Sequence, residues 1–216
     1  MSRIQSDEET LKRLKVLLPR RDPFVANARG SVEDGGMTAL LVAISSGLGA
    51  VVIDYLVAKG ADLTAWDGCA WTALHWAARK NHPHAAAKAL DAGVSVEVLC
   101  SPGGPGGEMT PLMVACRYQA VDVIRVLMAR GADPKWVHAN GTSILEHARN
   151  ELELAIDARH HEATMPHPSD VPHPSGHALS ASLDDHLERA QKVLQLMKQE
   201  VEEGTIVEYA QVYIED

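Results

Sequence analysis

Small apolar side chains alternate with polar ones at helical spacing in residues 71–93, and this stretch is the pattern that the chain repeats. Thr72 precedes a short alanine-rich helix, residues 81–83 break that helix, and a second helix runs to Gly93. Threonine is a good N-cap, and glycine, which has no Cβ, easily adopts the left-handed backbone of a helix C-cap. The stretch therefore predicts a hairpin of two helices.

The hairpin recurs along the chain at a nearly constant period. The aligned hydroxyl residues that start the copies are Thr38, Thr72, Thr110 and Ser143, at spacings of 34, 38 and 33 residues. The last copy is the most degenerate. A period in this range indicates a stacked array of helical hairpins, in which no hairpin has enough core to fold alone.

Two columns of apolar residues support the stacking. An alanine recurs at one point of each first helix, where a small side chain lets neighbouring helices approach closely; these residues are Ala43, Ala77, Ala115 and Ala148. A leucine column lies beside it and comprises Leu40, Leu74, Leu112 and Leu145. The abundance of alanine is therefore structural, and we expect both columns to be buried.

The repeats also begin and end with recurrent motifs. They begin with Thr110-Pro111-Leu112 or Thr72-Ala73-Leu74-His75 and end with Gly60-Ala61-Asp62 or Gly131-Ala132-Asp133. In these motifs, over residues 35–148, the chain resembles the ankyrin-repeat family. The resemblance implies an all-α solenoid of about four repeats, and a structural His75 that bridges loop backbone groups. Val94-Ser95 in place of Ala-Asp, and an extra residue near Gly47–Gly49, depart from the pattern.

The N-terminal part is expected to cap the array. Residues 7–18 have leucines on one face and acidic residues in the first turn, which predicts an amphipathic helix stopped by Pro19. Together with the loop predicted for residues 20–36, this cap occupies segment 1–34. The three clearest repeats follow over residues 35–140, with an extended glycine-rich loop at residues 100–108.

The fourth repeat is expected to be modified and split by an insertion. Within residues 141–204, a long first helix precedes a His/Pro-rich loop at residues 163–181, and a helix closed by Gly204 follows. We interpret that helix as the displaced second half of the repeat. The extended tail, residues 205–216, has the alternation of one strand, either packed back on the array or offered to a partner.

Charge and composition exclude several function classes. The net charge is −9, and residues 141–216 hold 15 acidic and 5 basic residues, which argues against nucleic acid or an anionic membrane as the main partner. No apolar run is long enough to span a membrane, and the first residues do not form a secretory signal. Three cysteines without a CxxC motif suit a reducing compartment, so we expect a cytoplasmic or nuclear protein.

The resemblance implies a binding surface on the hairpin tips and on the outward side of the first helices. The candidate protein-binding residues there are Trp66, Asp67, Trp71, Arg79, Lys80, Met109, Arg117, Tyr118 and Trp136. Turn residues have little backbone cover, so we expect Trp66 and Trp71 to be partly exposed; the alternative is that both indoles pack over the repeat junction. Trp76 lies between Leu74 and Ala77, which predicts a core position.

No catalytic or cofactor site emerges from the sequence. Cys69 and Cys116 lack a predictable base, and most of the C-terminal histidines lie in the Pro-rich loop, where ligand geometry would not be fixed. We therefore expect a non-catalytic protein-interaction module without cofactor or metal, monomeric outside its complex. The alternatives are a structural subunit of a larger assembly, and a metal-binding or enzymatic protein that uses the histidine loop.

Overall fold

The computed structural model describes residues 3–17, 22–31, 35–100, 108–137, 141–164 and 184–199. The chain divides into two compact units, Met1–Asp133 and Pro134–Asp216. Within the described residues the regular structure is helical, and the β-structure is limited to isolated bridges. The all-α prediction is confirmed.

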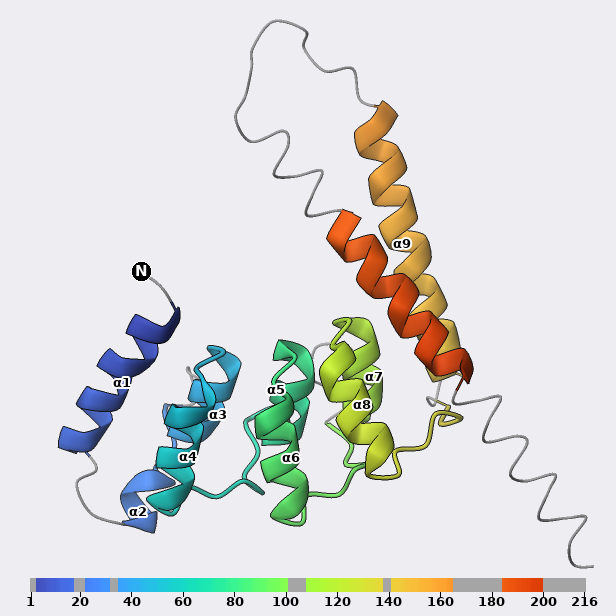
Figure 1. Ribbon diagram of the computed structural model, residues 1–216. Helices are drawn as coiled ribbons and strands as arrows, with labels where there is room; N and C mark the ends of the chain where they lie inside the picture. The colour runs from blue at the N-terminus through green and yellow to red at the C-terminus, as the bar shows by residue number, and fades with distance from the viewer. Residues whose placement is uncertain are drawn as a thin grey trace, which may run out of the picture. The chain divides into compact units, whose positions relative to one another are not determined.

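Helical hairpins stand side by side in the first unit (Figure 1). Their first helices are α3 (Ala39–Ser45), α5 (Ala73–Lys80) and α7 (Pro111–Arg117). Their second helices are α4 (Ala50–Ala58), α6 (Pro83–Asp91) and α8 (Val121–Ala129). The helices α3, α5 and α7 pack in one row and α4, α6 and α8 in another, so the hairpins form the predicted stacked array.

The predicted hydroxyl residues cap the first helices. The Thr38 hydroxyl accepts the backbone N–H of Leu41, and the Thr110 hydroxyl accepts that of Met113. Thr72 and His75 form a reciprocal capping box. Each cap satisfies a backbone donor that the helix leaves free, which stabilises the helix by about 1 kcal/mol.

A left-handed residue makes the turn in each of these hairpins, nine positions after the cap. The turn residues are Gly47, Asn81 and Gln119, with φ of 70°, 49° and 54°. Glycine and asparagine adopt this conformation more readily than other residues. The extra residue of the first copy follows Gly47, because α4 begins 12 positions after Thr38, whereas α6 and α8 begin 11 positions after Thr72 and Thr110.

Side chains from one repeat complete the backbone hydrogen bonding of the next. The Asn81 amide oxygen accepts the N–H groups of Asp122 and Val123 in the first turn of α8, at 3.1 and 3.3 Å. His82 Nε2 donates to the Leu48 carbonyl at 2.8 Å. Glu97 accepts the backbone N–H of Asp133 at 2.7 Å. These bonds fix the spacing between hairpins, which apolar packing alone would leave less well defined.

The alanine column is confirmed. Its members Ala43, Ala77, Ala115 and Ala148 are all buried. The leucine column is confirmed for the hairpins of the first unit, in which Leu40, Leu74 and Leu112 are fully buried. It is wrong for the last copy, where Leu145 is half-buried and the neighbouring Ile144 is buried.

The N-terminal helix α1 (Arg3–Leu17) packs against α4, as expected of a cap. The Asp7 carboxylate accepts the N–H of Gly49, the N-cap residue of α4, at 3.0 Å. The prediction of acidic residues in the first turn is wrong, because α1 already starts at Arg3. The segment predicted as loop contains a short helix, α2 (Pro23–Ala26).

The second unit contains α9 (Ile144–Thr164), a helix of 21 residues, and a helix over residues 184–199. Ser143 and Glu146 form a capping box at the start of α9, and Val137 bridges Ser143. The long first helix is confirmed, although it continues through two residues that were predicted as loop. The glycine-rich residues 101–107, residues 165–183 of the predicted loop, Gly204 and the tail 205–216 lie outside the described residues.

Candidate functional site

Asp67 organises the hairpin tip that precedes α5. One carboxylate oxygen accepts the backbone N–H groups of Cys69 and Trp71, both at 2.9 Å, and the other accepts the indole N–H of Trp76 at 3.0 Å. The tip also contains Ala70 in the left-handed conformation, with φ of 56°. Asp67 is 7% exposed, so its predicted role in direct protein binding is replaced by a structural role.

Trp71 is buried, and the prediction of a partly exposed indole is wrong. Its exposed fraction is 1%, and its ring centroid lies 5.0 Å from that of Trp76. Trp71 precedes the cap Thr72 and Trp76 is the fourth helical residue, which is the arrangement of a hydrophobic staple. The alternative of local packing therefore holds for Trp71. Its buried indole N–H has no acceptor among the described residues.

Met109 occupies the same position before Thr110 and is also buried, so it is not available to a partner. Its carbonyl accepts a hydrogen bond from His75 Nε2 at 3.1 Å, while His75 Nδ1 accepts the Thr72 N–H at 3.3 Å. Burial lowers the pKa of His75 to about 4. The predicted bridging role of this histidine is confirmed.

Trp76 is half-buried, so its predicted core position is wrong. It belongs to a surface cluster with Arg79 and Tyr118. The guanidinium carbon of Arg79 lies over the Trp76 and Tyr118 rings, 5.3 Å from each centroid, and 5.9 Å from that of Trp71. Trp76 and Arg79 are on α5, whereas Tyr118 is the C-cap residue of α7. Two adjacent repeats therefore hold this arginine between aromatic rings at the surface.

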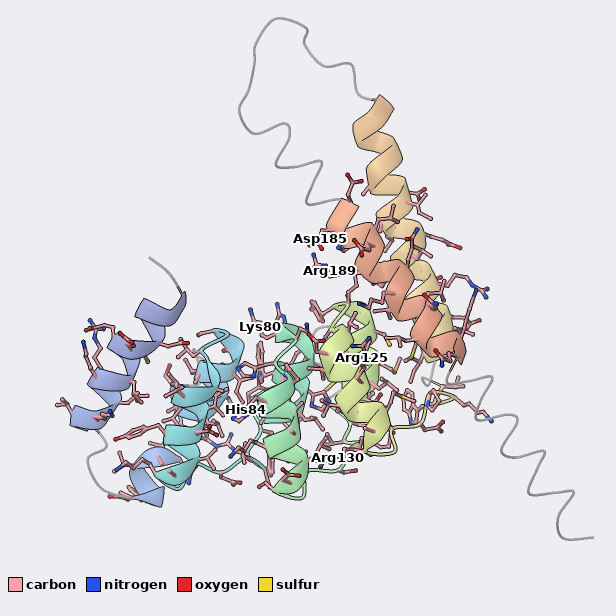
Figure 2. All side chains as sticks on the ribbon, in the orientation of Figure 1. Lys80, His84, Arg125, Arg130, Asp185 and Arg189 are labelled. Atoms are coloured by element: carbon pink, nitrogen blue, oxygen red, sulfur yellow. The ribbon has the colours of Figure 1, made fainter. Side chains whose placement is uncertain are left out.

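Two further cations lie next to this cluster. Lys80 ends α5 and Arg117 ends α7, and both are exposed. Figure 2 shows Lys80 at the end of its helix. We define the first-helix face by the fourth, seventh and eighth positions after each cap. Its members are the residues at these positions that are not buried: Val42, Ser45, Ser46, Trp76, Arg79, Lys80, Arg117 and Tyr118.

Several charged residues on or next to the second helices form ion pairs between repeats. Asp54 bonds His84 at 2.8 Å and Lys88 at 3.1 Å, and Asp91 bonds Arg130 at 2.8 Å. Desolvation raises the pKa of Asp54, but the hydrogen bonds from His84 and Lys88 outweigh it and lower this pKa below its ordinary value. These pairs join neighbouring repeats, so they are explained by stacking.

The other predicted tryptophans have different surroundings. Trp66 is 56% exposed, as expected, and the Arg29 guanidinium lies 5.8 Å from its ring centroid. Trp66 bridges Thr72 as Arg29 bridges Thr38, so the two residues occupy equivalent sites on successive hairpins. Trp136 is half-buried and belongs to the second unit. Sequence reasoning missed Arg29 and the surface role of Trp76.

Reactive groups do not converge within the described part of the chain. Cys116 is fully buried in α7, and burial raises the pKa of its thiol to about 12. The described residues contain no group of three His, Cys, Asp or Glu side chains placed to hold a metal ion. They also include no helix long and apolar enough to cross a membrane.

The comparisons with known proteins agree with this geometry. A family model of ankyrin repeats in three copies matches residues 4–100, and a single ankyrin-repeat model matches residues 108–136. The matched residues make up more than half of the chain. No individual curated protein matches it. The first family match begins within α1, so it includes the helix that packs against the first hairpin.

Proposed function

Because this chain belongs to the ankyrin-repeat family, we propose that it is a non-catalytic module that binds another protein through the first-helix face. Ankyrin repeats generally mediate protein–protein interactions, and for this reason we expect the partner to be a protein. The observation that supports this particular face is the cluster of Arg79 between Trp76 and Tyr118. A cytoplasmic or nuclear localisation, which suits three cysteines that form no disulfide, and a monomeric state outside the complex belong to the same proposal.

The cluster has the properties of an interaction hot spot. Tryptophan, tyrosine and arginine are the residue types that concentrate binding energy, and Tyr118 is 39% exposed. The rings restrict the arginine before any partner arrives, so less side-chain entropy is lost on binding than for a free surface arginine. Trp66 and Arg29 on the hairpin tips extend the contact area.

Two alternatives make different predictions. A permanent subunit of a larger assembly would aggregate or stay with other chains when purified, whereas the proposed module is a soluble monomer. A metal carrier would depend on the histidines of residues 160–177, and metal analysis of the untagged chain would then show nearly stoichiometric zinc, copper or nickel. Size-exclusion chromatography with light scattering, together with this metal analysis, separates the three functions.

Affinity capture from the native source tests the proposed face. The full chain and the variant Arg79→Ala/Tyr118→Ala serve as bait, and Arg125→Ala is the matched control. Arg125 is an exposed arginine on α8, in the other row of helices (Figure 2). We expect the double variant to lose the captured protein and the control to keep it. Equal capture by all three baits would refute the assignment of the face.

A further inference from the structure

The first-helix face changes in chemistry along the array. The fourth position after the cap is Val42 in α3 and Trp76 in α5, and both are apolar and at least partly exposed. The seventh and eighth positions are serines in α3, but Arg79 and Lys80 in α5 and Arg117 and Tyr118 in α7. Positions three and four apart share one side of a helix, so the face is uncharged at α3, where Val42 is its apolar residue, and cationic at α5 and α7.

This face also has a single sign of charge. The helices α3, α5 and α7 carry three cations, Arg79, Lys80 and Arg117, and their sequences contain no aspartate or glutamate. In the part of the chain that the structure describes, none of the three cations forms an ion pair. The carboxylate of Asp67, behind Trp76, is already bonded to three N–H groups. The cations of this face are therefore available to a partner.

Arg79 is suited to a carboxylate in particular. Its guanidinium carbon lies 5.3 Å from the centroids of two aromatic rings, and this cation–π attraction does not require its N–H donors to form conventional hydrogen bonds. No hydrogen bond from these donors is recorded within the described residues. A planar guanidinium held in this way can bind a carboxylate through two parallel hydrogen bonds, which lysine cannot do.

We propose that the first-helix face binds an acidic segment of a protein partner, with a carboxylate on Arg79 and a neighbouring apolar side chain on Val42 and Trp76. This inference rests on the proposed function and specifies its partner. Lys80 and Arg117 strengthen the attraction to further acidic residues of the segment. Nucleic acid is disfavoured, because a polyphosphate needs a long basic surface and the chain as a whole has a net charge of −9.

Selection from a random peptide library displayed on phage, with the immobilised full chain as bait, tests this proposal. The net charge of the chain repels acidic peptides in general, so their enrichment would reflect a specific site. We expect the enriched peptides to pair Asp or Glu with an adjacent apolar residue. Enrichment of basic or neutral peptides, or no enrichment at all, would overturn the acidic-segment proposal.

The most enriched peptide is then synthesised with a fluorophore and titrated with the chain and its variants. We expect Arg79→Lys and Arg79→Gln each to weaken binding by about tenfold or more, and the control Arg125→Gln to leave it unchanged. The peptide in which Gln replaces Glu, and Asn replaces Asp, should lose binding to a similar degree. A peptide that tolerates both Arg79 variants contradicts the proposal.

Two outcomes separate this inference from the proposed function. If neutral peptides bind and Trp76→Ala or Tyr118→Ala abolishes their binding, the face is a protein-binding site but its partner is not acidic. If a fluorescent single-stranded oligonucleotide binds and Arg79→Gln abolishes this binding, both the acidic segment and the protein partner are wrong.

Discussion

The guanidinium carbon of Arg79 lies 5.3 Å from the ring centroid of Tyr118, although the two residues belong to successive repeats. The contact joins the last turn of α5 to the C-cap of α7. It therefore depends on the stacking of the hairpins, and the surface that we propose for binding exists only when the repeats are assembled.

This contact predicts an energetic coupling between the two repeats. In a double-mutant cycle, we expect Arg79→Ala and Tyr118→Ala to couple by about 0.5–1 kcal/mol in the free energy of unfolding, since the site is partly solvated. Urea denaturation followed by tryptophan fluorescence gives the four values. The pair Arg125→Ala and Tyr118→Ala should be additive, and coupling of equal size there would show that the cycle reports a general effect.

A second prediction concerns the buried carboxylate of Asp67. We expect Asp67→Ala to lower the free energy of unfolding by about 2–4 kcal/mol, because it leaves three N–H groups without their acceptor. Asp91→Ala removes an exposed ion pair with Arg130 and should cost less than about 1 kcal/mol. Comparable losses in the two denaturation curves would contradict the structural role of Asp67.

The sequence predicted those features of the fold that depend on local spacing. Thr38, Thr72, Thr110 and Ser143 all cap helices, because a cap involves only the residue and the first turn after it. Because each cap marks the start of one copy, the spacing of the caps also gives the repeat period. The split last repeat was predicted only in outline, because no other copy in the chain has a first helix of this length or the same buried positions.

The candidate site was predicted less well, because burial depends on how the hairpin tip closes. Asp67 binds the backbone of Trp71 and holds its ring inward, and composition gives no sign of this. A signal was nevertheless present: an apolar residue just before the cap and another at the fourth helical position predict a staple. That rule would have assigned Trp71 and Met109 to the interior. Helical spacing would have placed Trp76 beside Arg79.

The two staple tryptophans should respond differently to the same substitution. Trp71→Phe shrinks a buried ring but removes an N–H that has no acceptor among the described residues, so the two effects oppose each other and the net change should stay within about 1 kcal/mol. Trp76→Phe breaks the bond to Asp67 and should cost about 1–2 kcal/mol, although Trp76 is the more exposed residue. Denaturant titrations that place the larger loss at position 71 would refute this account.

Stability should also depend on pH through His75. Its pKa is lowered from 6.5 to about 4 in the folded chain, so between these values the unfolded chain binds more protons. The stabilisation is therefore complete above about pH 6.5 and is lost as the pH falls towards 4, by up to about 3 kcal/mol. Unfolding free energies measured across this range should fall less steeply in His75→Gln than in the parent chain. The control His84→Gln, at a half-buried histidine of α6, should keep the steep fall.

Site-specific photo-crosslinking in the native source tests the first-helix face most directly. A benzophenone amino acid replaces Lys80, on the middle first helix of the proposed face, or Arg125, on the other row of helices. The account predicts that the crosslinker at position 80 joins the chain to a partner protein and that the one at position 125 does not. Crosslinking of the same partner from position 125 alone would contradict it.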